Sequence, residues 1–216
     1  MGERRRRRGH WLMAAGYDRF MRTLERQVMA QRRARLIPDL AGDLLEIGAG
    51  TGANLPYYQS ASRLVAAEPD PAMRARLARR TADASVPVEV SDASAESLPF
   101  PDASFDAVVA TLVLCSVDNP DRALAEVHRV LRPTGRLVVI EHVRGEGRLA
   151  RWQDRLTPLF VRAAGGCHPN RDTRAAIERA GFTMERHEAF QPLPGWVPTS
   201  PMLQAVAIPT TSQQHP

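Results

Sequence analysis

The chain has 216 residues, of which 44% are hydrophobic, a length and composition that suit one domain with a substantial core. All 29 basic residues are arginine, which excludes reactions that need a lysine amine, such as Schiff-base formation or phosphate binding by a Walker-type loop. The net charge of +5 comes from one end: residues 1–35 hold 11 arginines and 3 acids, whereas residues 36–216 hold 18 arginines and 21 acids. Because the body of the chain is mildly acidic, we expect no nucleic acid partner.

The N-terminal region has two parts. Residues 1–10 form an arginine-rich tail, which we interpret either as disordered and solvated or as a contact for an anionic surface. Residues 11–38 are predicted to form an amphipathic helix that Pro38 ends, with apolar side chains at spacings of three and four. This helix either caps the core or lies on a membrane surface, so peripheral membrane contact is an open alternative.

No segment of the sequence is predicted to cross a membrane. The longest mostly apolar stretch, residues 107–117, is far shorter than the roughly 20 residues that span a bilayer, and we recognise no cleavable leader. The two cysteines, Cys115 and Cys167, lie far apart in the sequence and match neither a CxxC pattern nor a Cys/His metal spacing. We therefore expect a cytoplasmic protein with no disulfide framework and no metal site.

From Asp43 onward predicted strands alternate with predicted helices, a pattern typical of an α/β domain with a parallel sheet. The seven predicted strands cover residues 43–47, 63–68, 86–90, 105–112, 136–143, 183–189 and 203–208. The predicted helices cover residues 53–58, 71–82, 120–131, 148–164 and 171–180, with capping side chains at Asp70, Asn119 and Asp172. The domain is predicted to span residues 39–209, followed by a polar tail over residues 210–216.

A glycine-rich turn after the first predicted strand carries the strongest functional signal. The run Glu46-Ile47-Gly48-Ala49-Gly50-Thr51-Gly52 allows a tight turn and lets a ligand lie against bare backbone, with its anionic end near the N-terminus of the next helix. Glu46, ahead of the first glycine, suits a cationic ligand better than a pyrophosphate. Glu68 ends the next strand, 16 residues after Gly52, where a carboxylate can accept hydrogen bonds from both hydroxyls of a ribose.

Two further runs complete a family resemblance. Together with residues 46–52 and Glu68, residues 98–106 (LPFPDASFD) and 129–135 (RVLRPTG) resemble motifs of the class I S-adenosylmethionine-dependent methyltransferases with a type 11 domain. The resemblance implies a Rossmann-like, seven-stranded, mostly parallel sheet with one reversed strand and helices on both faces. It also implies that S-adenosyl-L-methionine is the cofactor and lies over the carboxyl ends of the first strands.

The same resemblance assigns cofactor contacts. Glu46 would hold the amino group of the methionine part directly or through water, and Glu68 would bind the ribose. In the adenine loop, either Ser94 replaces the acid that the family usually has, or the loop is two residues longer and Asp92 supplies it. The cofactor-binding set is Glu46, Gly48, Gly50, Gly52, Glu68, Ser94, Ala95, Glu96 and Thr111.

A narrower resemblance concerns the acceptor. Residues 111–117, 141–143, 166–167 and 178–180, with residues 51–54, are similar to the methyltransferase-like 7 group, membrane-associated enzymes that methylate small thiols. The resemblance implies methyl transfer to a small, hydrophobic acceptor, with a thiol favoured. The alternatives are N- or C-methylation of a lipid or quinone, a cofactor-binding protein without catalysis, and an RNA-modifying enzyme, although no Asn-Pro-Pro-Tyr type motif follows the fourth strand.

His142 and His168 are the candidate catalytic residues, although a thiol needs little acid–base assistance at neutral pH. His142 ends the fifth predicted strand and either serves the acceptor or only hydrogen-bonds a neighbouring loop. His168 either borders the acceptor pocket or is an exposed loop residue. Cys115 is interpreted as a small buried hydrophobe and Cys167 as a loop residue, with acceptor contact as its alternative. The apolar stripe of the helix over residues 148–164 is either a pocket lid or core packing.

Overall fold

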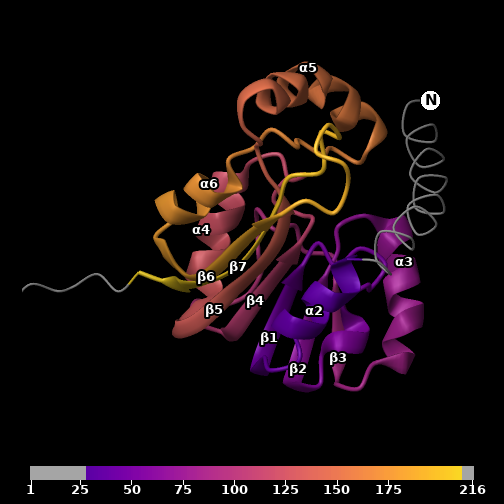
Figure 1. The fold of residues 1–216 in the computed structure, drawn as a ribbon. Helices are drawn as coiled ribbons and strands as arrows, with labels where there is room; N and C mark the ends of the chain where they lie inside the picture. Colours follow the sequence, from indigo (N-terminus) through magenta and orange to yellow (C-terminus); the bar gives the residue numbers. More distant parts are fainter. Residues whose placement is uncertain (1–27, 211–216) are drawn as a thin grey trace, which may run out of the picture.

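The computed structural model describes residues 28–210, and a seven-stranded sheet forms the middle of the molecule (Figure 1). The strands are β1 (Ala41–Ile47), β2 (Ser60–Ala67), β3 (Val88–Ser91), β4 (Phe105–Thr111), β5 (Leu131–His142), β6 (Phe182–Phe190) and β7 (Met202–Pro209). All seven predicted strands are present, with ends that differ from the prediction by a few residues.

The strand order in the sheet is β3-β2-β1-β4-β5-β7-β6. Strands β1 to β5 pair in parallel, whereas β7 runs antiparallel to both of its neighbours, β5 and β6. The chain therefore builds the sheet in opposite directions from β1, and the carboxyl ends of β1 and β4 form the switch point where such sheets bind ligands. This topology confirms the predicted α/β sheet with one reversed strand.

Helices lie between the strands along the chain. They are α2 (Ala30–Leu36), α3 (Pro71–Arg80), α4 (Pro120–Val130), α5 (Gly147–Ala163) and α6 (Thr173–Arg179), with the 3-10 turns η2 (Leu55–Tyr57) and η3 (Thr81–Asp83). The three predicted caps are confirmed, because Asp70, Asn119 and Asp172 each accept a backbone N–H from the first turn of a helix. Helix α2 lies within the predicted helix over residues 11–38; the part of that helix before residue 28, the tail 1–10 and residues 211–216 lie outside the described residues.

The predicted helix over residues 53–58 is wrong. After the glycine-rich turn the chain makes only η2, because β2 begins at Ser60, three residues earlier than predicted, and leaves no room for a second turn. The side chains of Asn54 and Tyr58 also turn inward from this segment to hydrogen-bond Glu46. The predicted contact between a ligand and the N-terminus of a helix is therefore not available here.

The central strands are buried on both faces, because their alternate side chains pack under different helices. In β1, Leu45 and Ile47 belong to the core that includes residues of α4 and α6, whereas Leu44 packs in a second core with Leu77 of α3. Glu46 interrupts this apolar strand, and only 2% of its surface is exposed. A buried carboxylate is costly unless it has partners, so Glu46 is a candidate functional residue.

Helix α5 lies beyond the carboxyl end of β5 (Figure 1) and is held there by one buried amide. Gln153 Nε2 donates to the carbonyl groups of Val143, Pro169 and Pro198, and its Oε1 accepts the N–H of Gly145. These partners belong to three different connecting segments. One side chain therefore joins the helix to all three.

The outer surface of α5 is partly apolar. Trp152 is 55% exposed and Leu159 is 62% exposed, so core packing is wrong as an interpretation of these two residues. Among residues 28–210, no helix is both long enough and apolar enough to cross a membrane.

Candidate active site

Three glycines shape the turn after β1, and two of them are required by packing. Gly48, Gly50 and Gly52 have φ angles of +57°, +58° and +82°, a conformation that other residues rarely adopt. A Cβ at Gly48 would lie 2.5 Å from Val113 Cγ2, and a Cβ at Gly52 would lie 2.7 Å from Leu55 Cδ1. Gly48 and Gly52 therefore allow the turn to pack closely against its neighbours.

Gly50 differs from the other two glycines because its Cα faces open space. The nearest atom to a Cβ built there is the carbonyl oxygen of Gly48, at 4.0 Å. The N–H of Gly50 donates to Glu68 Oε2 at 2.8 Å, which ties the turn to the residue after β2. The turn thus offers bare backbone to a ligand at Gly50, beside a carboxylate.

Glu46 lies under this turn in a network of buried polar groups. Asn54 Nδ2 donates to Glu46 Oε1 at 2.9 Å, and the Tyr58 hydroxyl donates to Glu46 Oε2 at 3.0 Å. Asn54 Nδ2 also donates to Thr111 Oγ1 at 3.1 Å, which links the ends of β1 and β4. Asn54 Oδ1 is buried and has no hydrogen-bond partner among the described residues. An orphaned acceptor of this kind points to a ligand that brings a donor.

The two carboxylates of the site are both unfavourably buried. Burial raises the pKa of Glu46 to about 7, against the smaller opposing effect of its hydrogen bond from Tyr58. Burial also raises the pKa of Glu68, whose two oxygens accept the N–H groups of Asp70 and Gly50 at 2.8 Å each. A carboxylate has about four acceptor positions, so both oxygens of Glu68 can accept a further donor. The pair favours a ligand with a positive charge and hydroxyl groups.

The loop after β3 holds the predicted adenine contacts. Glu96 Oε1 accepts the N–H of Asn119, the cap of α4, at 2.7 Å, and Ala95 is buried in the core. Asp92 and Ser94 are both exposed. Both registers proposed for the adenine loop therefore remain predictions.

At the carboxyl ends of β4 and β5, one buried carboxylate holds the loop that follows β4. Glu141 is fully buried, and its oxygens accept the N–H groups of Val113, Leu114 and Cys115 at 2.7, 2.9 and 3.3 Å. This carboxylate is engaged by the backbone, so it positions the loop and does not serve as a base.

The loop held by Glu141 places Cys115 beside His142 and Cys167. The two Sγ atoms are 3.8 Å apart, and His142 Nδ1 lies 3.7 Å from Cys115 Sγ and 3.5 Å from Cys167 Sγ. Both cysteines are free thiols and both are buried. Their separation in the sequence therefore does not keep them apart in the fold, and sequence spacing is no argument against a metal site here.

The contact between the two thiols shifts their pKa values in opposite directions. The hydrogen bond with Cys167, together with burial, raises the pKa of Cys115 to about 12, whereas the same hydrogen bond lowers the pKa of Cys167. Burial alone would lower the pKa of His142, but the hydrogen bond and charge of Cys115 outweigh it and the net shift is upward. Cys167 is therefore the more acidic thiol of the pair.

His168 adjoins this group through its backbone. Its N–H donates to the carbonyl of Cys115 at 2.7 Å, and its ring Nδ1 is buried without a hydrogen-bond partner among the described residues. The side chain is only partly exposed, so the alternative of a fully exposed loop histidine is wrong.

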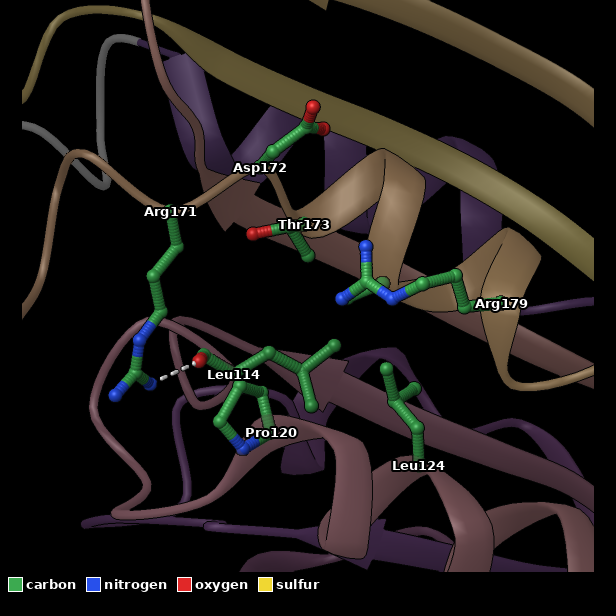
Figure 2. A pocket seen from close by; sticks show the side chains of 8 residues that line it. Leu114, Pro120, Leu124, Arg171, Asp172, Thr173 and Arg179 are labelled. Carbon is green, nitrogen blue, oxygen red and sulfur yellow. Dashed lines mark hydrogen bonds between the residues drawn. The ribbon is translucent and has the colours of Figure 1, made fainter.

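A hollow of about 140 Å³ lies between the first turns of α4 and α6 (Figure 2). Leu114 and Leu124 contribute apolar walls, and Arg171 and Arg179 contribute positive charge. In Figure 2 the guanidinium of Arg171 donates to the carbonyl of Leu114, at 2.7 Å. The glycine-rich turn does not line this hollow, so it is not the cofactor cradle.

Known proteins match this chain over most of its length. A methyltransferase domain family matches residues 45–139. The thiol S-methyltransferase TMT1B of Rattus norvegicus is 36% identical over 209 residues, which cover 91% of this chain and 82% of the relative. The chain belongs to the S-adenosylmethionine-dependent methyltransferases. The thiol S-methyltransferase TMT1A of Homo sapiens is 33% identical and covers 89% of this methyltransferase and 81% of its own length.

The fold of the methyltransferase is shared with solved structures of more distant sequence. An S-adenosylmethionine-dependent methyltransferase from Mesorhizobium loti has a TM-score of 0.60 at 21% identity and covers 82% of this chain and 96% of its own. This likeness confirms the Rossmann-like fold. The methyl donor of the methyltransferase is S-adenosyl-L-methionine.

The residues of the methyltransferase fit this cofactor in two respects. The open face of Gly50 leaves room where any side chain would intrude. The unpartnered Asn54 Oδ1 belongs to the same side chain that donates to Glu46, so an ammonium group near it would meet a lone pair and a carboxylate together. Both features suit the amino acid end of a sulfonium nucleoside.

Sequence reasoning did not single out three residues of the candidate site. Asn54 and Tyr58 follow Glu46 by 8 and 12 residues, and the signal was their position in the short segment between the glycine-rich turn and β2. Glu141 was noticed only as part of a motif. Its signal was an acid directly after the apolar run of residues 137–140, one residue from the end of β5.

Proposed function

We propose that this methyltransferase methylates the sulfur of a small, hydrophobic thiol. The relatives that align with about nine-tenths of the chain support the proposal, because they are named thiol S-methyltransferases. The observation that carries the proposal is that Glu141 accepts hydrogen bonds from three backbone N–H groups. The end of β5 therefore offers a histidine to the acceptor and no free carboxylate. A thiol suits this site, because its pKa of about 8.5 leaves a few per cent as thiolate at neutral pH.

The proposal gives each part of the cradle a task. Glu46 and Asn54 hold the ammonium group of the cofactor, and Glu68 accepts hydrogen bonds from its ribose hydroxyls. Thr111 orients Asn54 by accepting a hydrogen bond from its amide. S-adenosyl-L-methionine supplies, when bound, a methyl group that its sulfonium charge has already activated. The adenine contacts remain those predicted in the loop after β3, Ser94, Ala95 and Glu96.

On the acceptor side the chain has to align the reactants and exclude water. In-line attack requires the acceptor sulfur at about 3 to 3.5 Å from the methyl carbon. Helix α5, held by Gln153, covers this side, and its removal would admit solvent. Of the two predicted catalytic histidines, His168 has a buried Nδ1 available for the proton of the acceptor, whereas Nδ1 of His142 faces Cys115 and Cys167.

The test is an acceptor panel with purified full-length protein and S-adenosyl-L-methionine. The panel compares an alkyl thiol with the matched alcohol and amine, a phenol, a quinol and phosphatidylethanolamine. We expect methylated product from the thiol at a rate at least about 10-fold above every other acceptor. Product from the quinol or the lipid amine alone would establish the runner-up function, and cofactor binding without any product would favour the non-catalytic alternative.

We also propose a cytoplasmic enzyme that contacts membranes peripherally. Trp152 and Leu159 are exposed on α5 together with Arg151 and Arg155, a combination that favours an anionic lipid surface. Cosedimentation with phosphatidylserine-containing vesicles should exceed that with pure phosphatidylcholine vesicles, and Trp152→Ser should reduce it. Equal recovery of the wild type with both kinds of vesicle would contradict the proposal.

A further inference from the structure

Cys115, His142 and Cys167 come from three separate segments and meet at the carboxyl edge of the sheet. Cys115 lies in the loop after β4, His142 is the last residue of β5, and Cys167 follows α5. Each offers one soft or borderline ligand atom, and these atoms are mutual neighbours. Thiolate and imidazole are the ligands that zinc prefers.

The three distances match the edges of a tetrahedron around a zinc ion. With Zn–S bonds of about 2.3 Å and Zn–N bonds of about 2.05 Å, tetrahedral angles place two sulfurs about 3.8 Å apart and a sulfur and a nitrogen about 3.6 Å apart. The chain has 3.8 Å between the sulfurs and 3.7 and 3.5 Å from the sulfurs to His142 Nδ1. A disulfide would instead need the sulfurs at about 2.05 Å.

Backbone contacts hold the two cysteine segments together without help from an ion. The N–H of His168 donates to the carbonyl of Cys115 at 2.7 Å. Arg171 Nη1 donates to the carbonyl of Leu114, also at 2.7 Å (Figure 2). Glu141 accepts the N–H of Cys115. The ligand set is therefore preorganised by its surroundings, which lowers the entropic cost of binding an ion.

The same loop borders the cofactor cradle. Thr111 contacts Asn54, and Val113 packs where a Cβ of Gly48 would lie. Cys115 follows Val113 by two residues. An ion held by Cys115 would thus lie beside the cradle, on the side where the acceptor has to approach.

We propose that Cys115, Cys167 and His142 Nδ1 bind a zinc ion whose fourth position receives the acceptor thiol. Three protein ligands with one open position are the usual arrangement of a catalytic zinc site. The assignment of the fourth position rests on the proposed thiol function, whereas the ion site itself does not. In this arrangement His142 is a ligand, and it positions the ion.

The chemistry of the site balances without a redox step. When the ion binds, each cysteine thiol gives its proton to solvent and forms an S–Zn bond. The acceptor thiol then takes the place of solvent at the fourth position, forms an S–Zn bond and gives its proton to Nδ1 of His168. A coordinated thiol is deprotonated, so its sulfur keeps an electron pair for attack on the methyl carbon.

The ion site is tested first, on the full-length chain reduced with a phosphine and freed of metal by a chelator. Titration with Zn²⁺ against a chromophoric chelator should show one ion per chain. Cys115→Ser, Cys167→Ser and His142→Asn should each weaken zinc binding by at least about 100-fold, more than the loss of an outer partner of a ligand usually costs. His187→Asn, an exposed histidine on β6, is the matched control and should bind zinc as the wild type does.

The titration of the wild type shows whether the chain binds zinc, even where a variant fails to fold. Cofactor binding by each variant shows whether that variant is folded. Reduced wild type that binds no zinc would overturn the proposal. So would zinc binding that all three ligand variants retain.

The role of the fourth position is tested by replacing zinc with Co²⁺. An alkyl thiol, but not the matched alcohol, should change the visible spectrum of the cobalt protein, and removal of the metal should lower the rate of thiol methylation at least about 10-fold. An unchanged spectrum, or full thiol methylation by metal-free protein, would refute the role of the ion and leave the proposed function standing. Absence of thiol methylation in zinc-loaded protein would instead refute the proposed function, while the titration still judges the ion site.

Discussion

The two halves that we propose for this site, one for the cofactor and one for the acceptor, are assembled differently. The cofactor half lies mostly within β1, the glycine-rich turn and β2, and Gly50 and Glu68 are joined across only 18 residues. In the acceptor half, Cys115 and Cys167 are 52 residues apart in the chain, and the sheet order brings them together. The first half therefore depends on local turn geometry, and the second depends on the packing of α5 and its connections.

The two halves also differ in their electrostatics. Glu46 and Glu68 give the cofactor half two buried carboxylates, which suit a cationic ligand. The acceptor half presents two thiols and an imidazole and uses its buried carboxylate, Glu141, to hold a loop. Substitutions should accordingly affect the two ligands separately.

Gly50→Asp should produce the largest effect, a loss of cofactor affinity of at least about 100-fold, because a side chain fills the open face of the turn. Gly147→Asp is the matched control, since Gly147 has a φ of +54° and no atom within 4 Å of a built Cβ. Both variants bear a backbone cost of about 1 to 2 kcal/mol, but only the first should lose binding in calorimetric titration. Equal binding by the two would place the cofactor elsewhere.

Glu46 should make the free energy of unfolding fall as the pH rises. Between the ordinary carboxyl pKa of 4.5 and the pKa of about 7 in the fold, the folded chain keeps a proton that the unfolded chain has released. Glu46 should therefore contribute about 3 kcal/mol to the decrease in stability across this interval, and Glu46→Gln should remove that contribution. Urea unfolding at a series of pH values measures it, with the exposed Glu178→Gln as a control that keeps the wild-type slope.

Gln153→Leu should destabilise the fold by about 2 kcal/mol, because the carbonyl groups of Val143, Pro169 and Pro198 lose a donor. We expect a raised KM for the acceptor and an unchanged Kd for the cofactor. The neighbouring Trp152→Ser alters an exposed side chain and should change stability by less than about 0.5 kcal/mol. A parallel loss of cofactor affinity in Gln153→Leu would show that the halves are not separate.

Asp106→Asn should have the smallest effect, since Asp106 lies at the amino end of β4, whereas the candidate site lies at the carboxyl ends of the strands. Asp106 accepts the N–H of Asp43 at 2.8 Å and pairs with Arg132 in a partly exposed position. A pair of this kind contributes less than about 1 kcal/mol. Thermal unfolding should shift slightly, and the affinities for cofactor and acceptor should stay as in the wild type.

The fold could be predicted because β1, β2, β4, β5 and β7 each contain an apolar run, but one boundary could not. Ser60, Ala61 and Ser62 are small or polar and resemble a loop, yet residues 60 and 61 pair with the start of β1. Their place in the sheet comes from a neighbouring strand and not from their own hydrophobicity. This is why the short segment before them was mistaken for a helix.

The candidate site also has residues that the sequence could identify and residues that it could not. Glu46 could be identified because it lies one residue before the end of β1, next to the glycine-rich turn, and Glu68 because it directly follows β2. The proximity of Cys115, His142 and Cys167 could not, because it requires that β5 lie beside β4 and that the chain return after α5. The spacing of these residues along the chain does not indicate that they are close in the fold.

The amide of Gln153 has a consequence for the entry of the acceptor and the exit of the product. Because one side chain is shared by the segments at residues 143–145, 169 and 198, movement of any one of them away from α5 costs a buried hydrogen bond. Opening of this side by displacement of a segment should therefore become easier in Gln153→Leu, and a lid motion of that kind is a common limit on turnover.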